Sequence, residues 1–136
     1  KSLNNDIELA ATAEETTARV MQMVTDPARQ RRSDPGNPDI CNVFSLHKMF
    51  TPPEKVAEIN IECRRAGIGC VDCKRILAAN MNAYFAPLRE KRRVFENDPE
   101  GTWDMLRDGA ARASLLAEET MVDVRAAVGL PALQKG

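Results

Sequence analysis

The stretch GCVDCKRILAANMNAYFAPL, residues 69–88, carries apolar side chains at helical spacing and decides the fold class. One face of the predicted helix holds Cys73, Leu77, Met81, Tyr84 and Leu88. Apolar residues that recur at this spacing form a stripe along one side of a helix, which packs against a core. We therefore predict a long helix that begins after Gly69, and we expect Pro87 to kink or split it.

The segments before this helix have helix start and stop signals. Thr12 and Glu15 form the S/T-x-x-E pattern of a capping box, and the helix that follows should end near Thr25. Asn37-Pro38 and Thr51-Pro52 each resemble an N-cap followed by proline at the first helical position. Two further helices are therefore expected before residue 69.

The C-terminal third predicts one more helix, which opens at Asp98-Pro99 and ends before Gly129. Its expected buried stripe consists of Trp103, Leu106, Ala110, Ala113, Ala117, Met121, Val124 and Val128. Gly67 is expected to be the C-cap of the helix that precedes the long one. No segment alternates with a period of two residues, so we predict an all-α bundle of about five helices with short loops.

Composition excludes some classes of protein. Hydrophobic residues make up 43% of the 136 residues and charged residues 29%, which is typical of a folded domain. The net charge of −1 argues against a uniformly basic protein, although a local basic face can still bind nucleic acid. We see no secretory signal and no apolar run that would span a membrane. The chain opens on Lys1 in a loop-like KSLNN, so we expect a cytoplasmic chain that was cut from a longer one.

Known catalytic and nucleotide-binding motifs are missing from the sequence. There is no phosphate-binding P-loop and no G-x-G-x-x-G. His47 is the single histidine, so no Ser/His/Asp set can be assembled. We interpret His47 as a packed or partly exposed helix residue.

The four cysteines have the spacing Cys-x21-Cys-x6-Cys-x2-Cys, at Cys41, Cys63, Cys70 and Cys73. A Cys-x2-Cys pair places two sulfurs within reach of one metal centre, and thiolates at a helix N-terminus are stabilised by its dipole. Structural zinc commonly uses two such pairs, whereas iron–sulfur clusters tolerate uneven spacing. A metal centre, ordinary core cysteines and a redox pair all remain open at this point.

Basic residues flank the cysteines at Arg64, Arg65, Lys74 and Arg75. They could neutralise an anionic cluster or bind RNA phosphates, and a solvated helix face is the alternative. Two other basic groups have the same two interpretations, and they consist of Arg29, Arg31 and Arg32 and of Arg89, Lys91, Arg92 and Arg93.

Several stretches together resemble bacterial tryptophanyl-tRNA synthetases, which are class I aminoacyl-tRNA synthetases. KSLNN is similar to the end of the KMSKS loop, and VTDPARQRRSDPGNPDICNVFSLHKMF resembles the segment that follows it. AGIGCVDCK, followed by a long charged helix, resembles the tRNA-binding helical region. The resemblance implies that residues 1–11 are the end of that loop and a connector, and that residues 12–136 are a helical anticodon-binding domain.

The family implies an ATP-dependent ligase that activates tryptophan and transfers it to its tRNA. Lys1 and Ser2 match the last two residues of KMSKS, which contact ATP phosphates. The HIGH motif and the nucleotide-binding sheet are absent, so the chain alone is expected to be inactive, with ATP and tryptophan bound only by the complete homodimeric enzyme. The four cysteines match the set that holds a 4Fe–4S cluster in some members, with zinc as the alternative metal. Arg64, Arg65, Lys74 and Arg75 are the expected contacts of the anticodon arm of tRNA(Trp). The alternative function is a stand-alone, non-catalytic metal-binding domain that binds RNA or protein.

Overall fold

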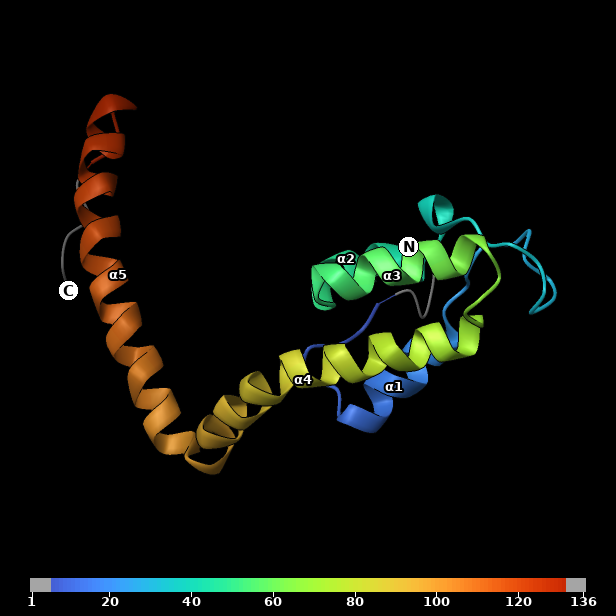
Figure 1. Cartoon of the computed structure of the whole chain (residues 1–136). Helices are drawn as coiled ribbons and strands as arrows, with labels where there is room; N and C mark the ends of the chain where they lie inside the picture. Colours follow the sequence, from blue (N-terminus) through green and yellow to red (C-terminus); the bar gives the residue numbers. More distant parts are fainter. Residues whose placement is uncertain (1–5, 132–136) are drawn as a thin grey trace. The chain divides into compact units, whose positions relative to one another are not determined.

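The computed structural model describes residues 6–131, and all regular secondary structure among these residues is helical. These residues form five α-helices, one short 3-10 helix and no strand. The elements are α1 (Ala13–Gln22), η1 (Pro38–Ile40), α2 (Asn42–Phe50), α3 (Pro53–Arg64), α4 (Cys70–Asn97) and α5 (Pro99–Ala127) (Figure 1). The predicted all-α class is confirmed. None of the described helices combines the length and apolar composition that crossing a lipid bilayer requires.

The chain divides into two compact units, and the boundary lies between Glu90 and Lys91, inside α4. The first unit contains α1, η1, α2, α3 and most of α4. The second contains the last turns of α4 and all of α5. Pro87 lies within α4 without splitting it.

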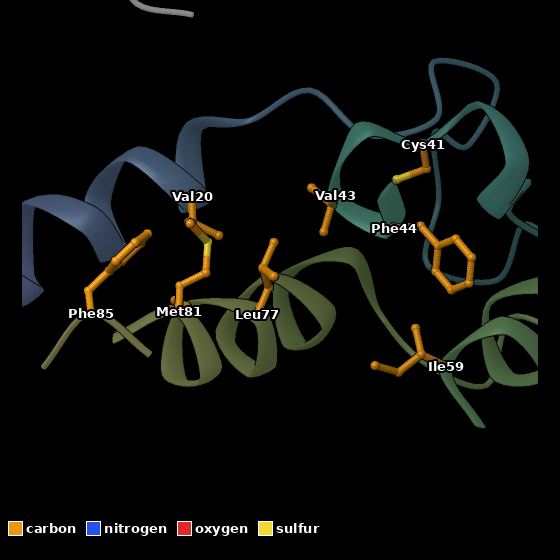
Figure 2. Packing of buried hydrophobic residues seen from close by; sticks show 9 residues of the cluster. Val20, Cys41, Val43, Phe44, Ile59, Leu77, Met81 and Phe85 are labelled. Atoms are coloured by element: carbon orange, nitrogen blue, oxygen red, sulfur yellow. The ribbon is translucent and has the colours of Figure 1, made fainter. Parts of the chain in front are cut away.

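The hydrophobic core lies in the first unit, and each of its long helices contributes to it (Figure 2). Val20 of α1, Val43 of α2 and Leu77 of α4 are fully buried, and Ile59 of α3 is 1% exposed. Met81 extends the core along α4 toward Val20. Burial of apolar surface of this kind is the main stabilising term of a small helical domain.

The predicted start of α1 is correct in detail. The Thr12 hydroxyl accepts from the Glu15 backbone N–H at 3.1 Å, and the Glu15 carboxylate accepts from the Thr12 N–H at 2.8 Å. The prediction at Asn37 needs a correction, since its side chain caps only η1, by accepting from the Asp39 N–H. Cys41 is extended, with φ −90° and ψ 116°, so the chain turns there and α2 begins separately.

The predicted C-cap at Gly67 is also wrong. The left-handed residue after α3 is Ala66, with φ 59°. The Gly67 N–H donates to the Glu62 carbonyl at 2.7 Å, and the Ala66 N–H donates to the Cys63 carbonyl at 3.2 Å. This is the Schellman pattern, with alanine in the position that glycine usually occupies.

The predicted core face of α4 is partly wrong. Leu77 and Met81 are buried, but Tyr84 is 58% exposed and Leu88 46%, while Phe85 is buried. The core stripe continues at intervals of four residues, through Leu77, Met81 and Phe85, and the Tyr84 ring packs edge-on against Phe50 at the border of the core.

The helix predicted in the C-terminal third is present as α5, but its predicted buried face is wrong, because no residue of α5 is buried. Trp103 is 60% exposed, and the other large apolar side chains of the stripe are exposed as well. The spacing of apolar residues predicts the helix, whereas burial of its apolar face requires a packing partner that cannot be identified from the spacing.

Candidate metal centre and its basic surroundings

The cysteines come from helix ends in the first unit. Cys41 precedes α2, Cys63 lies in the last turn of α3, and Cys70 and Cys73 lie in the first turn of α4. All four are free thiols, of which Cys41 is buried and the other three are partly buried. Cys70 and Cys73 thus lie at the N-terminal end of α4, where the helix dipole is positive.

The four thiols lie within electrostatic reach of one another. Burial, together with the nearby thiols of Cys41, Cys63 and Cys70, raises the pKa of Cys73 to about 12, although Arg29 opposes the rise. Burial likewise raises the pKa of Cys63, with Arg29 again lowering it. A metal would therefore have to displace protons from these thiols. Among residues 6–131, no three His, Cys, Asp or Glu side chains are placed so as to hold one metal ion together, so convergence of the four sulfurs on one metal stays a prediction.

Arg29 belongs to the cysteine site, which the sequence did not indicate. Its Nη1 lies 3.9 Å from the Cys63 sulfur, and its Nη2 donates to the Ile68 carbonyl at 2.7 Å and to the Arg32 carbonyl at 3.0 Å. Its Nε is buried and has no hydrogen-bond partner within the described part of the chain. The guanidinium thus brings a positive charge, with one unused donor, to the edge of the thiol cluster.

The loop between α1 and η1 packs closely on Cys63. The Gly36 N–H donates to the Cys63 carbonyl at 2.9 Å, and a Cβ at position 36 would lie 2.6 Å from the Cys63 sulfur. Only glycine fits there without moving the sulfur. The buried Asp26 carboxylate fixes the same loop, because it accepts from the N–H groups of Ala28 and Asn37, each at 2.8 Å.

Like Arg29, His47 belongs to the cysteine site although the sequence analysis did not assign it there. It is a packed helix residue, as predicted, and it is fully buried. Its Nε2 lies 3.2 Å from the Cys73 carbonyl oxygen and 3.3 Å from the Cys73 sulfur. Its Nδ1 lies 2.8 Å from the Thr51 hydroxyl. Burial lowers the pKa of His47, which favours the neutral ring. The only feature of the sequence that could have indicated a partner for His47 is its i, i+4 spacing to Thr51.

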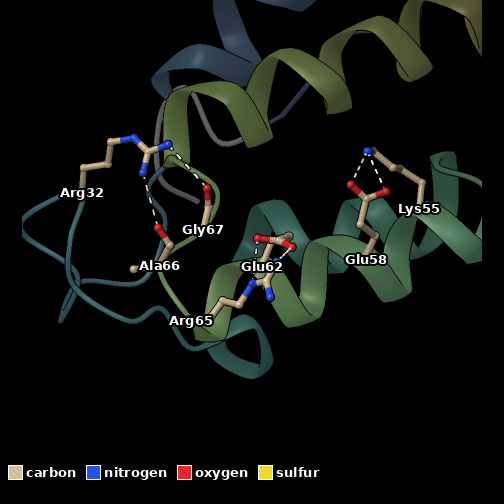
Figure 3. Close-up of polar contacts among 7 residues, drawn as sticks. All are labelled: Arg32, Lys55, Glu58, Glu62, Arg65, Ala66 and Gly67. Atoms are coloured by element: carbon tan, nitrogen blue, oxygen red, sulfur yellow. Dashed lines mark hydrogen bonds and ion pairs between the residues drawn. The ribbon is translucent and has the colours of Figure 1, made fainter.

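The four basic residues predicted to bind tRNA have different surroundings. Arg64 donates to Asp39 at 2.7 Å and to Asn60 at 2.8 Å, and Arg75 donates to Asp72 at 3.1 Å. Arg65 pairs with Glu62 (Figure 3). The three arginines are exposed, with 48%, 68% and 66% of the side-chain surface of Arg64, Arg75 and Arg65 accessible. Exposed ion pairs of this kind contribute little to stability.

Lys74 differs from these three arginines. It is half-buried, and its Nζ donates to the Met21 carbonyl at 2.9 Å, which ties the end of α1 to α4.

The other two basic groups also contain residues that bind the protein itself. Arg32 donates to the carbonyls of Ala66 and Gly67 at 3.3 and 3.4 Å (Figure 3). Arg89 donates to the Ala11 carbonyl at 2.8 Å and to the Thr16 hydroxyl at 2.8 Å. Lys1 and Ser2, predicted to contact ATP phosphates, lie outside the described residues.

Comparisons with known proteins agree on one family. A search against family models gave no match. The chain is 40% identical over 132 residues to the tryptophan–tRNA ligase of Aquifex aeolicus, a match that covers 96% of this chain and 33% of that protein. It is 41% identical over 131 residues to the Thermotoga maritima tryptophan–tRNA ligase, with 96% of this chain and 40% of that protein covered.

A solved structure gives the same result. The structure of Campylobacter jejuni tryptophanyl-tRNA synthetase in complex with ADP and tryptophan matches 96% of this chain and 40% of that one, with a TM-score of 0.79 and 28% identity. The chain thus spans about a third to two fifths of the length of the curated relatives it matches. Over nearly its whole length, the chain is homologous to the C-terminal region of tryptophan–tRNA ligases.

Proposed function

We propose that this chain is the tRNA-binding part of a tryptophan–tRNA ligase, an enzyme that activates tryptophan with ATP and transfers it to tRNA(Trp). The observation that carries the proposal is 40% identity over 96% of the chain to a ligase of which the chain covers only 33%. In this assignment the helical unit binds the anticodon arm, and activation takes place in parts of the ligase that lie outside the matched region. A cytoplasmic location and a homodimeric complete enzyme belong to the same proposal.

Arg64, Arg65 and Arg75 are the residues that we assign to tRNA phosphates. Arg64 and Arg75 are each paired with an exposed carboxylate in the free chain, and Arg65 is paired with Glu62, whose side chain is 23% exposed. Such a pair is weak in water, so a phosphate can replace the carboxylate at little cost. Arginine also binds phosphate bidentately, which adds geometric selectivity.

The test is alanine substitution of these arginines in the complete ligase that carries this chain, with tRNA(Trp) affinity measured across salt concentrations. Loss of one phosphate contact should reduce the slope of log affinity against log salt by about one unit. Arg107→Ala is the matched control, because Arg107 forms an exposed i, i+3 pair with Asp104 as Arg75 does with Asp72. Unchanged slopes at all three positions, with the fold intact, would place the tRNA on another surface.

For the cysteines, the proposal includes a resident metal centre, a 4Fe–4S cluster rather than zinc. It is supported by the resemblance to the cluster-containing members and by the uneven spacing, which suits an iron–sulfur cluster. The neighbourhood also fits an anionic group, since the four thiols are free and the Arg29 guanidinium with its unused Nε lies beside them. Cys41, Cys63, Cys70 and Cys73 would hold it. When bound, such a group cross-links the ends of α2, α3 and α4 and stabilises the fold by its binding energy.

Metal analysis of anaerobically prepared protein tests the centre directly. Iron and sulfide together with broad visible absorption, both lost on chelation or oxidation, are the expected result. A colourless protein with one zinc would support the zinc alternative, and a fully folded protein that takes up neither metal would contradict the centre.

The resemblance assigns Lys1 and Ser2 to ATP phosphates in the complete ligase. A lysine ammonium can stabilise charge that develops only in the transition state. Lys1→Ala should therefore lower the rate of tryptophan activation much more than it weakens tryptophan binding. Equal effects on both would contradict the assignment.

A further inference from the structure

A chain of hydrogen bonds leads from α4 through α2 and back to Cys73. Asn80 Nδ2 donates to the Thr51 hydroxyl oxygen at 3.0 Å. The Thr51 hydroxyl lies 2.8 Å from His47 Nδ1, and His47 Nε2 lies 3.2 and 3.3 Å from the carbonyl oxygen and the sulfur of Cys73. His47 and Thr51 are both buried, so water does not compete for these groups.

The direction of this chain follows from the chemistry of its end. The carbonyl oxygen of Cys73 can only accept, so the proton must be on His47 Nε2. In a neutral ring, Nδ1 is then an acceptor, and the Thr51 hydroxyl must donate to it. The Thr51 oxygen in turn accepts from the Asn80 amide, which can only donate through its nitrogen. Every group therefore has one consistent role.

We propose that His47 is a positioning residue for Cys73, with its Nε2–H, oriented by Thr51 and Asn80, donated to both the carbonyl oxygen and the sulfur of that cysteine. The bond fixes the sulfur and offers a donor to a thiolate at this position. Its consequence for a bound metal rests on the proposed four-cysteine centre, whereas the hydrogen-bond chain itself does not.

This assignment explains why a polar ring is retained in the core. Without partners, a buried imidazole would cost stability, yet both ring nitrogens are paired here. A hydrogen bond to a metal-bound sulfur stabilises the more negative, reduced state, and removing it shifts the reduction potential of an iron–sulfur cluster to more negative values.

The first arm of the test uses the metal-free, reduced chain. Nitrogen-15 NMR of the imidazole identifies the protonated nitrogen, and we expect the Nε2–H tautomer for His47. A neutral ring protonated on Nδ1 would overturn the proposal whether or not the chain binds metal. Because this arm needs no metal, its result stays separate from any failure of the proposed centre.

The second arm measures the midpoint potential after reconstitution with iron and sulfide. His47→Leu and Thr51→Val should both shift it to more negative values, and His47→Gln, which can retain an N–H donor, should restore part of the shift. Thr51→Val leaves His47 in place, so it keeps the test valid if His47→Leu fails to fold. Thr17→Val is the matched control, because Thr17 accepts from Asn82 at 3.0 Å as Thr51 does from Asn80, but on α1. Potentials equal to wild type in folded His47→Leu and Thr51→Val proteins would overturn the proposal.

Discussion

Replacement of Arg89 by methionine should destabilise the first unit strongly, although in the sequence Arg89 is only one of several basic residues on a predicted helix. Its Nε donates to the Ala11 carbonyl at 2.8 Å, and its Nη2 donates to the Thr16 hydroxyl at 2.8 Å and to the Thr12 carbonyl at 3.3 Å. Its Nη1 donates to the Asn82 side chain at 3.1 Å. One guanidinium thus holds the start of α1 against α4.

The size of the effect follows from the acceptors that lose their donor. A hydrogen bond to a charged group contributes about 1.5–3 kcal/mol, and several bonds to one guanidinium do not add fully. Thr16 is fully buried and would lose this donor, whereas Ala11 and Thr12 lie nearer the surface, where water can replace the guanidinium. We therefore expect Arg89→Met to lower the free energy of unfolding by about 2–4 kcal/mol.

Arg92→Met is the matched control on the same helix. Arg92 pairs with Glu96, and the two side chains are 59% and 54% exposed. Its loss should change the free energy of unfolding by less than about 0.5 kcal/mol. Urea denaturation followed by circular dichroism gives both values, and amide hydrogen exchange at Val20 and Leu77 reports the first unit separately. Equal stabilities of the two variants would refute the assignment of Arg89 to the helix junction.

Three further outcomes are expected. Ala66→Gly should raise the free energy of unfolding by about 0.5–1 kcal/mol, because Ala66 has a left-handed backbone that glycine adopts without strain. Ala79→Gly, at an exposed position inside α4, should lower it by about the same amount, and urea denaturation of both variants tests the opposite signs. Leu77→Ala should lose about 2–5 kcal/mol in the same assay, since Leu77 is fully buried, and a loss below 1 kcal/mol would contradict its place in the core. The chain by itself should catalyse no tryptophan-dependent pyrophosphate exchange, because its described residues are helical and its match covers a third of a ligase; measurable exchange would contradict the proposed division of labour.

Helices could be predicted because their signals are local. The capping box of α1 requires only the hydroxyl of Thr12 and the carboxylate of Glu15 at the right spacing, and both bonds form. The end of α3 could not be predicted in the same way. Gly67 has the residue type that favours a left-handed cap, but Ala66 adopts it, because the two hydrogen bonds that close α3 fix the position of the cap.

The core was predictable only in part, for a related reason. Spacing identified Leu77 and Met81, which are buried, but it also included Tyr84, which is exposed. The choice between Tyr84 and Phe85 depends on Phe50, a residue of another helix that packs against both rings. A helical period defines a stripe about as wide as two neighbouring residues, and only the partner helix decides between them.

The functional roles of single charges were the least predictable feature, because their partners are mostly backbone carbonyls. Arg29, Lys74 and Arg89 each appear in a basic group, yet each donates to a carbonyl distant in the sequence. Composition contains no information on such acceptors. His47 was missed as a partner of Cys73 for the same reason, since the last residues of α2 and all of α3 separate the two in the sequence.

These contacts also restrict which charges can serve tRNA. A donor bound to a backbone carbonyl cannot turn to a phosphate without opening the junction that it holds, whereas a donor paired with an exposed carboxylate can exchange partners. Arg64 and Arg75 belong to the second kind, and we place Arg65 with them because it is itself 66% exposed, although its partner Glu62 is only 23% exposed. Lys74 belongs to the first kind, through Met21. Each arginine should therefore reduce the salt slope of tRNA binding when it is removed, while Lys74→Met should lower the stability of the first unit and leave the slope unchanged. A reduced slope for Lys74→Met, at unchanged stability, would mean that its ammonium leaves Met21 and binds phosphate in the complex.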